Sequence, residues 1–115
     1  MNPADVMNTL NQHVGVTNGI NAERLAMKIT NAIERDLSAE RKLREIIADL
    51  RMQGVRICGH PSTGYYLAET AEDIQMTCKF LRQRAMTSLV QEARLKNIAL
   101  AELVGQMQLE LETAA

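Results

Sequence analysis

Two cysteines and two histidines are the residues of this sequence that could ligate a metal or act as nucleophiles: Cys58, Cys78, His13 and His60. A zinc site takes about four converging ligands, and the close Cys-x-x-Cys spacing typical of such sites is absent. Cys58 and His60 alternate on an expected strand, but no group beside them supplies an oxyanion site. We therefore interpret both cysteines as small core residues. We expect no metal, no cofactor and no catalytic residue, and the sequence does not indicate an enzyme.

Basic side chains are concentrated in two blocks, although the net charge of the 115 residues is only -1. Residues 41–56 carry five basic and two acidic side chains, and residues 74–96 carry five basic side chains and one acidic side chain. Lys and Arg beside a nucleic-acid backbone displace counterions and gain affinity. The two blocks are therefore either phosphate-contacting surfaces or solvated faces of helices.

Length and composition indicate a globular protein of about one domain. Hydrophobic residues make up 46% and charged residues 23% of the chain, which argues against long disorder. No stretch approaches the ~20 apolar residues of a membrane span. The N-terminus shows no basic region followed by an apolar run, so we expect no secretory signal. We expect a cytoplasmic protein that does not insert into a membrane.

Three N-cap residues, Asn2, Asn21 and Ser38, divide the first half of the chain into helices. The helices are expected over residues 3–14, from residue 22 to between residues 29 and 33, and over residues 38–53, with Gly15 and Gly54 closing the first and the third. The third helix carries an apolar stripe at helical spacing, formed by Leu43, Ile46, Ile47 and Leu50. Its opposite face holds Arg41, Glu45, Ala48 and Met52, with Arg44 and Arg51 flanking it on one side and Lys42 and Asp49 on the other.

The periodicity changes after the third helix. Residues 55–58 alternate like a strand, residues 59–64 form a turn cluster, and residues 65–68 form the returning strand. Such a hairpin must pack on another element to be stable, and the third helix is the natural partner. Residues 70–112 are helical, and a bend near Asn97 is expected because a single helix of this length is uncommon.

Three segments, in this order, resemble parts of bacterial winged-helix regulators. The first is INAERLA at residues 20–26, which resembles the start of the second helix. The second is LREIIADLRMQGVRI at residues 43–57, which resembles the recognition helix and the first wing strand. The third is Gly64-Tyr65-Tyr66-Leu67, which resembles the Gly-Tyr-x-Leu of the biotin-repressor-like branch. The resemblance covers roughly residues 4–68, and residues 30–37 are longer than the tight turn typical of the family.

The resemblance implies a winged helix-turn-helix DNA-binding domain in a mainly α fold with a small β-hairpin. The third helix would enter the major groove of duplex DNA, its N-terminus would contact a phosphate, and the wing would lie along the backbone. The expected DNA-contacting residues are Ser38, Arg41, Lys42, Arg44, Glu45, Arg51, Arg56, His60, Ser62 and Thr63. The implied function is that of a small transcriptional regulator, such as one encoded by a bacteriophage or prophage. The alternative is an adaptor that binds proteins in a replication or phage–host complex.

Residues 70–115 form a helical segment that follows the winged-helix domain expected over residues 1–69. Their apolar stripe exceeds what so small a domain can cover, and surplus apolar surface usually meets another chain. We therefore expect a homodimer. The residues expected in its interface are Ile74, Leu81, Leu89, Leu100, Leu103, Val104 and Met107. In the alternative interpretation, the segment folds back and completes the core of its own chain.

Overall fold

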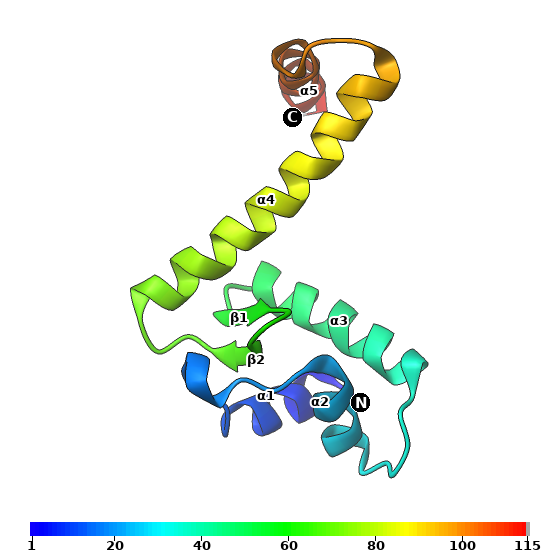
Figure 1. Ribbon diagram of the computed structural model, residues 1–115. Coiled ribbons are helices and arrows are strands. Elements are labelled where there is room, and N and C mark those ends of the chain that lie inside the picture. Colours follow the sequence, from blue (N-terminus) through cyan, green and yellow to red (C-terminus); the bar gives the residue numbers. More distant parts are fainter. Residues whose placement is uncertain (115) are drawn as a thin grey trace. The chain divides into compact units, whose positions relative to one another are not determined.

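A computed structural model describes residues 1–114 (Figure 1). The described chain is mainly helical and contains a two-stranded antiparallel hairpin, as the sequence predicts. The elements, in order, are α1 (Pro3–Leu10), the short 3-10 helix η1 (Val16–Asn18), α2 (Ala22–Thr30), α3 (Leu37–Met52), β1 (Ile57–His60), β2 (Gly64–Leu67), α4 (Ala71–Lys96) and α5 (Leu100–Ala114).

The first two helices begin at the predicted caps. The side-chain oxygen of Asn2 accepts the Asp5 N–H at 2.9 Å, and the Asp5 carboxylate accepts the Asn2 N–H at 3.0 Å, which together make a capping box. Asn21 accepts the Arg24 N–H at 2.8 Å in the same way. The first helix ends at Leu10 and does not reach Gly15, because the residues after it pair with the hairpin instead.

The hairpin is braced by the segment that links α1 to α2. Ile20 and Tyr65 exchange two backbone hydrogen bonds, of 2.9 and 2.7 Å. Further along the same edge, the Leu67 N–H donates to the His13 carbonyl at 2.8 Å and its carbonyl accepts the Gly15 N–H at 2.9 Å. Both edges of β2 are therefore hydrogen-bonded, one by β1 and the other by the linker. A hairpin that is marginal alone gains the support it needs.

Close approach of the linker requires glycine at two positions. A Cβ on Gly19 would collide with the backbone oxygen of Thr63. Gly64 has φ 76, and a Cβ there would collide with the backbone of Ile20. These contacts explain why the turn cluster and the linker each contain a glycine where they meet.

The core lies between the three N-terminal helices and the hairpin. Helices α1, α2 and α3 pack on one another, while β2 contacts α1 and β1 contacts α3 (Figure 1). The predicted stripe of α3 is buried. The core is aliphatic and consists of Val6, Leu10, Ile20, Leu25, Ala26, Leu43, Ile46, Ile47, Leu50 and Ile57.

The chain divides into two compact units, residues 1–77 and the residues from Cys78 onwards. The division falls inside α4, because the start of this helix is tied to the hairpin. The Asp73 carboxylate accepts the backbone N–H groups of Glu69 and Thr70, at 3.0 and 3.1 Å. The buried Thr77 hydroxyl accepts the Gly59 N–H at 3.2 Å. The boundary expected at residue 69 lies before these contacts.

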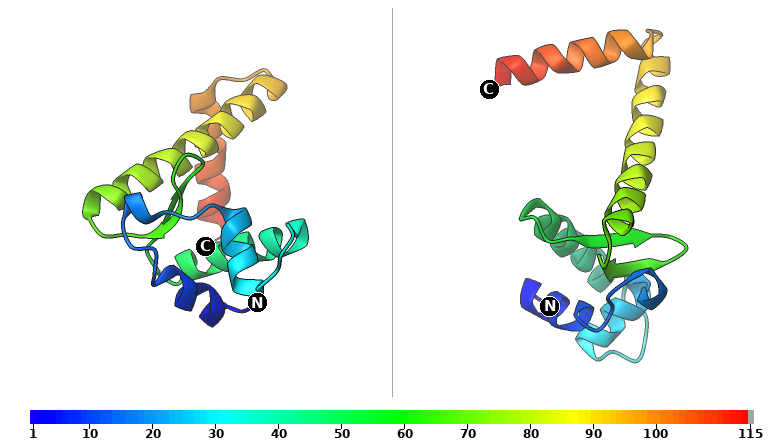
Figure 2. Two further views of the ribbon diagram at one scale, coloured as in Figure 1. Left: turned by 60° about the horizontal axis from the view of Figure 1, so that its bottom comes forward. Right: turned by 90° about the vertical axis from the view of Figure 1, so that its left-hand side faces the viewer.

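The second unit is a pair of helices joined at a corner. Helix α4 ends at Lys96, and Asn97 follows with a left-handed φ of 56, which confirms the predicted bend. The Ile98 N–H donates back to the Ala93 carbonyl at 3.0 Å and closes the end of the helix. Helix α5 then turns away from α4 and does not run back along it (Figure 2).

Candidate nucleic-acid interface

The face of α3 opposite the core is polar and exposed. The exposed side chains on it are Arg41, Lys42, Arg44, Glu45, Ala48, Asp49 and Met52. This arrangement confirms the amphipathic pattern that the sequence predicts for this helix. The face mixes both charges, since two carboxylates lie among the basic groups.

Arg41 and Lys42 are the unpaired cations of this face. Neither side chain makes a hydrogen bond or an ion pair with any other residue among those described. Arg44 differs, because its guanidinium lies 3.7 Å from the carboxylate of Glu40. Of the predicted DNA-contacting cations on α3, these two are therefore the most available to a phosphate or a base.

Glu40 is a buried carboxylate that sequence reasoning missed. It is only 2% exposed, and Arg35 donates two hydrogen bonds to it, from Nε to Oε2 at 2.8 Å and from Nη2 to Oε1 at 3.1 Å. The hydrogen bond from Arg35 holds the pKa of Glu40 below its usual value. Arg35 also lies 4.0 Å from Glu23 on α2. This ion-pair cluster fixes the loop between α2 and α3 to both helices.

The N-terminus of α3 is capped by Asp36, and the prediction of Ser38 as the cap is wrong. The Asp36 carboxylate accepts the N–H groups of Ser38 and Ala39, at 2.9 and 3.2 Å. A carboxylate there satisfies the free N–H groups and the helix dipole. It engages the same N–H groups that were expected to contact a phosphate. The Ser38 side chain itself is exposed.

Arg51 has a structural role. Its Nε donates to the carbonyl of Ile57 at 2.7 Å, and the side chain is partly buried. The bond joins the last turn of α3 to the first residue of the hairpin. Sequence periodicity places Arg51 beside the exposed face of α3. It cannot predict the hydrogen bond to Ile57, because the tertiary fold sets the position of β1.

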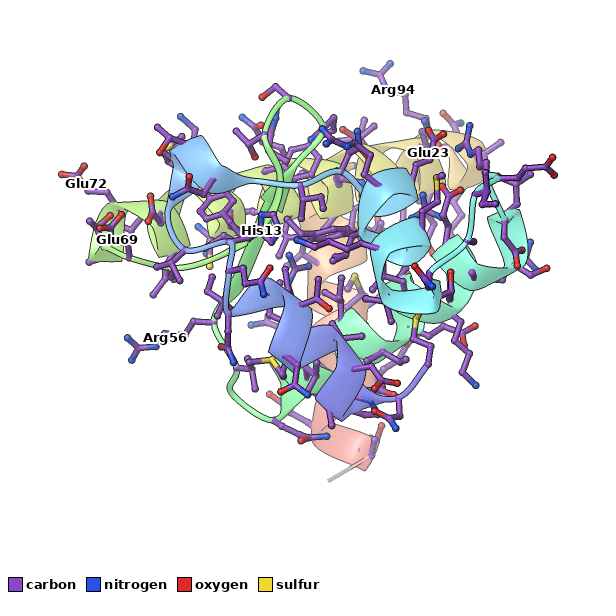
Figure 3. The ribbon with its side chains drawn as sticks, turned by 90° about the horizontal axis from the view of Figure 1, so that it is seen from below. His13, Glu23, Arg56, Glu69, Glu72 and Arg94 are labelled. Atoms are coloured by element: carbon purple, nitrogen blue, oxygen red, sulfur yellow. The ribbon has the colours of Figure 1, made fainter. Side chains whose placement is uncertain are left out.

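The remaining predicted contacts lie on the hairpin. Arg56, just before β1, is exposed and points away from the body of the first unit (Figure 3). At the turn, His60 Nδ1 accepts the Ser62 N–H at 3.0 Å and lies 2.7 Å from the Ser62 hydroxyl oxygen. The Thr63 N–H donates to the His60 carbonyl at 3.1 Å. The tip is therefore an ordered turn that exposes His60 and Ser62.

Cys58 and Tyr66 are buried on the face of the hairpin that packs on the start of α4, beside Thr77. Burial raises the pKa of the Cys58 thiol, and burial likewise raises the pKa of Tyr66. Cys58 is a core residue as predicted, whereas Cys78 is exposed in the single chain and the prediction of a core role for it is wrong. Nowhere in residues 1–114 do three or more His, Cys, Asp or Glu side chains gather so that they could hold a metal.

The residues predicted for a dimer interface are divided between the two units. Ile74 is half-buried in the first unit. In the second unit Leu103 is 2% exposed, whereas Leu81 is 41% and Val104 40% exposed. Leu89, Leu100 and Met107 are partly buried. Among residues 1–114, no helix combines the length and the apolar character needed to cross a membrane.

Comparison with known proteins gives no match: no family model matches the chain, and no curated protein or solved structure is significantly similar to it.

Proposed function

We propose that residues 1–77 form a winged-helix domain that binds duplex DNA through the exposed face of α3, as a small regulator of transcription. The observation that carries the proposal is the pair of unpaired cations, Arg41 and Lys42, on a helix whose opposite face is fully packed. An α-helix fits the major groove, and side chains on its outer face reach base edges and phosphates.

The hairpin supports the same proposal because it is anchored at one end of α3. Arg51 joins the two elements, and the linker braces the far edge of β2. With α3 in the groove, Arg56 and the turn at His60 are suited to the sugar–phosphate backbone, which needs cations and hydrogen-bond donors but no base readout. The Ser62 hydroxyl and backbone provide further polar groups at that tip.

The acidic residues of the face limit affinity for arbitrary sequences. Glu45 and Asp49 are exposed beside the cations, and each repels phosphate. A carboxylate can, however, accept a hydrogen bond from the amino group of cytosine. The mixed face therefore favours a reader of specific sequence over a general DNA-coating protein.

The proposal is tested by fluorescence anisotropy with a labelled random duplex of roughly 30 base pairs, titrated at several salt concentrations. If the domain makes three or four phosphate contacts, the slope of log K against log salt concentration should be about -3 to -4. Arg41→Ala/Lys42→Ala should weaken binding about tenfold or more and make the slope shallower. The control, Arg24→Ala/Lys28→Ala, removes two exposed cations from α2. Equal losses in both variants would show that binding is not centred on α3.

A second candidate function is protein binding, as an adaptor. Its specific support is the loop between α2 and α3, where Ile33 is 94% exposed, and the adjoining Leu37, which is 67% exposed. Two strongly exposed apolar side chains within five residues of the chain favour a protein partner. Absence of duplex binding at low salt, together with retention of a partner that Ile33→Ser/Leu37→Ser loses, would support the adaptor and contradict the DNA proposal.

A further inference from the structure

The second unit lacks a core of its own. Among residues 78–114, only Ala93 and Leu103 are buried. Leu81, Met86 and Leu111 are 41%, 40% and 70% exposed. Units below about 40 residues usually need a disulfide, a metal or oligomerisation to be stable. Within its described residues this unit has neither a disulfide nor a group of metal-binding side chains.

Each helix of the unit has an apolar stripe that its own chain covers only in part. On α5 the stripe is i, i+4, i+7, i+11 and consists of Leu100, Val104, Met107 and Leu111. On α4 it consists of Leu81, Ala85 and Leu89. The turn at Asn97 directs α5 away from α4, so α5 does not run back along α4 (Figure 2).

The two helices carry opposite charge. Residues 78–96 of α4 hold five basic side chains and one acidic side chain: Lys79, Arg82, Arg84, Arg94 and Lys96 against Glu92. Helix α5 holds three acidic side chains and no basic one: Glu102, Glu110 and Glu112. A surface made of one basic and one acidic helix is complementary to a second copy of itself.

We infer that two copies of this chain pair through the second unit, with α5 of each copy lying along α4 of the other. A two-fold axis makes the two contacts identical. Helix α5 of the first copy lies on α4 of the second copy, and α5 of the second copy lies on α4 of the first. The arrangement covers both apolar stripes and places each acidic helix against a basic one. It does not depend on DNA binding.

The first measurement is the mass in solution by sedimentation at micromolar concentration, which should be twice that of the chain. Two charge-reversal variants then test the pairing. The α5 variant is Glu102→Lys/Glu110→Lys/Glu112→Lys, and the α4 variant is Lys79→Glu/Arg82→Glu/Arg84→Glu. Each alone should dimerise about tenfold or more weakly, because like charges would face each other. Mixing the two variants, with one carrying a mass tag, should restore a dimer that contains one chain of each.

Two further variants separate association from folding. Val104→Ser/Leu111→Ser changes side chains that are 40% and 70% exposed in the single chain, so it should weaken the dimer while helix content measured by circular dichroism is kept. The matched control, Glu34→Lys/Glu69→Lys/Glu72→Lys, makes the same charge change at exposed positions of the first unit and should remain dimeric. A wild-type mass of one chain, or charge-reversed variants that dimerise as tightly as the wild type, would overturn the inference.

Discussion

The Nε of Arg51 donates a 2.7 Å hydrogen bond to the carbonyl oxygen of Ile57, and this bond ties the end of α3 to the start of the hairpin. Under the proposed function, α3 and the hairpin act on one DNA duplex and need a fixed relative position. This bond provides one connection, and the backbone pairing of Ile20 with Tyr65 provides another from the far edge.

Arg51→Met should destabilise the first unit by about 1.5–3 kcal/mol, because a charge-assisted hydrogen bond is lost and a carbonyl is left without its donor. Urea denaturation followed by circular dichroism measures the loss. Arg56→Met is the control, since that side chain is exposed and points into solvent (Figure 3). If Arg51 were only a DNA contact, the two variants would have the same stability.

Glu40→Gln should lower the free energy of unfolding at neutral pH and have little effect in acid. The hydrogen bond from Arg35 lowers the pKa of Glu40 in the folded protein, so the ionised carboxylate stabilises the fold. That contribution is fully present above the pKa of the unfolded state and is lost as pH falls through the lower pKa of the folded state. The denaturation midpoints of Glu40→Gln and wild type should therefore differ at pH 7 and converge as the pH is lowered to 3. A gap that does not depend on pH would contradict the ion pair, and Glu45→Gln serves as the exposed control.

Thr77→Val should destabilise the first unit by about 1–3 kcal/mol, because the buried Gly59 N–H loses its acceptor. Hydrogen exchange provides a local readout, since the Gly59 amide should exchange faster in the variant. Thr87→Val is the matched control in the same helix, where the exposed hydroxyl bonds only to the Gln83 carbonyl. Unchanged exchange at Gly59 would show that α4 does not hold the hairpin.

Cys58 should not react with a thiol reagent until the protein unfolds. It is 2% exposed, and burial raises the pKa of its thiol, so little thiolate is available at the surface. In Cys78→Ser, where Cys58 is the remaining thiol, labelling at pH 8 should be negligible in buffer and complete in urea. Rapid labelling of the folded variant would mean that the hairpin does not pack on α4 as described.

The sequence predicts the helical elements well because their signals are local. Asn2 and Asn21 cap the helices they were expected to cap, and the stripe from Leu43 to Leu50 is buried. The cap of α3 was mispredicted because Asp36 and Ser38 are both good caps. It is the Asp36 carboxylate that accepts the free N–H groups of Ser38 and Ala39.

The candidate site was less predictable, because it depends on contacts between residues that are distant in sequence or belong to different elements. Periodicity places Arg41, Arg44 and Arg51 on or beside the exposed face of α3. It does not show that Arg35, in the loop before α3, pairs with Glu40 or that the Ile57 carbonyl accepts a hydrogen bond from Arg51. The pairing of His13 and Gly15 with Leu67 likewise has no local signal.

We propose that the outer face of α3 contacts duplex DNA, and an NMR titration can locate that contact residue by residue. Isotope-labelled protein is titrated with a short duplex, and amide shifts are followed residue by residue. The largest changes are expected at Arg41, Lys42 and Glu45 on α3 and at His60 and Ser62 on the hairpin tip. Shift changes confined to the loop around Ile33 or to the second unit would contradict a DNA contact through α3. The absence of any shift change at low salt would contradict it as well.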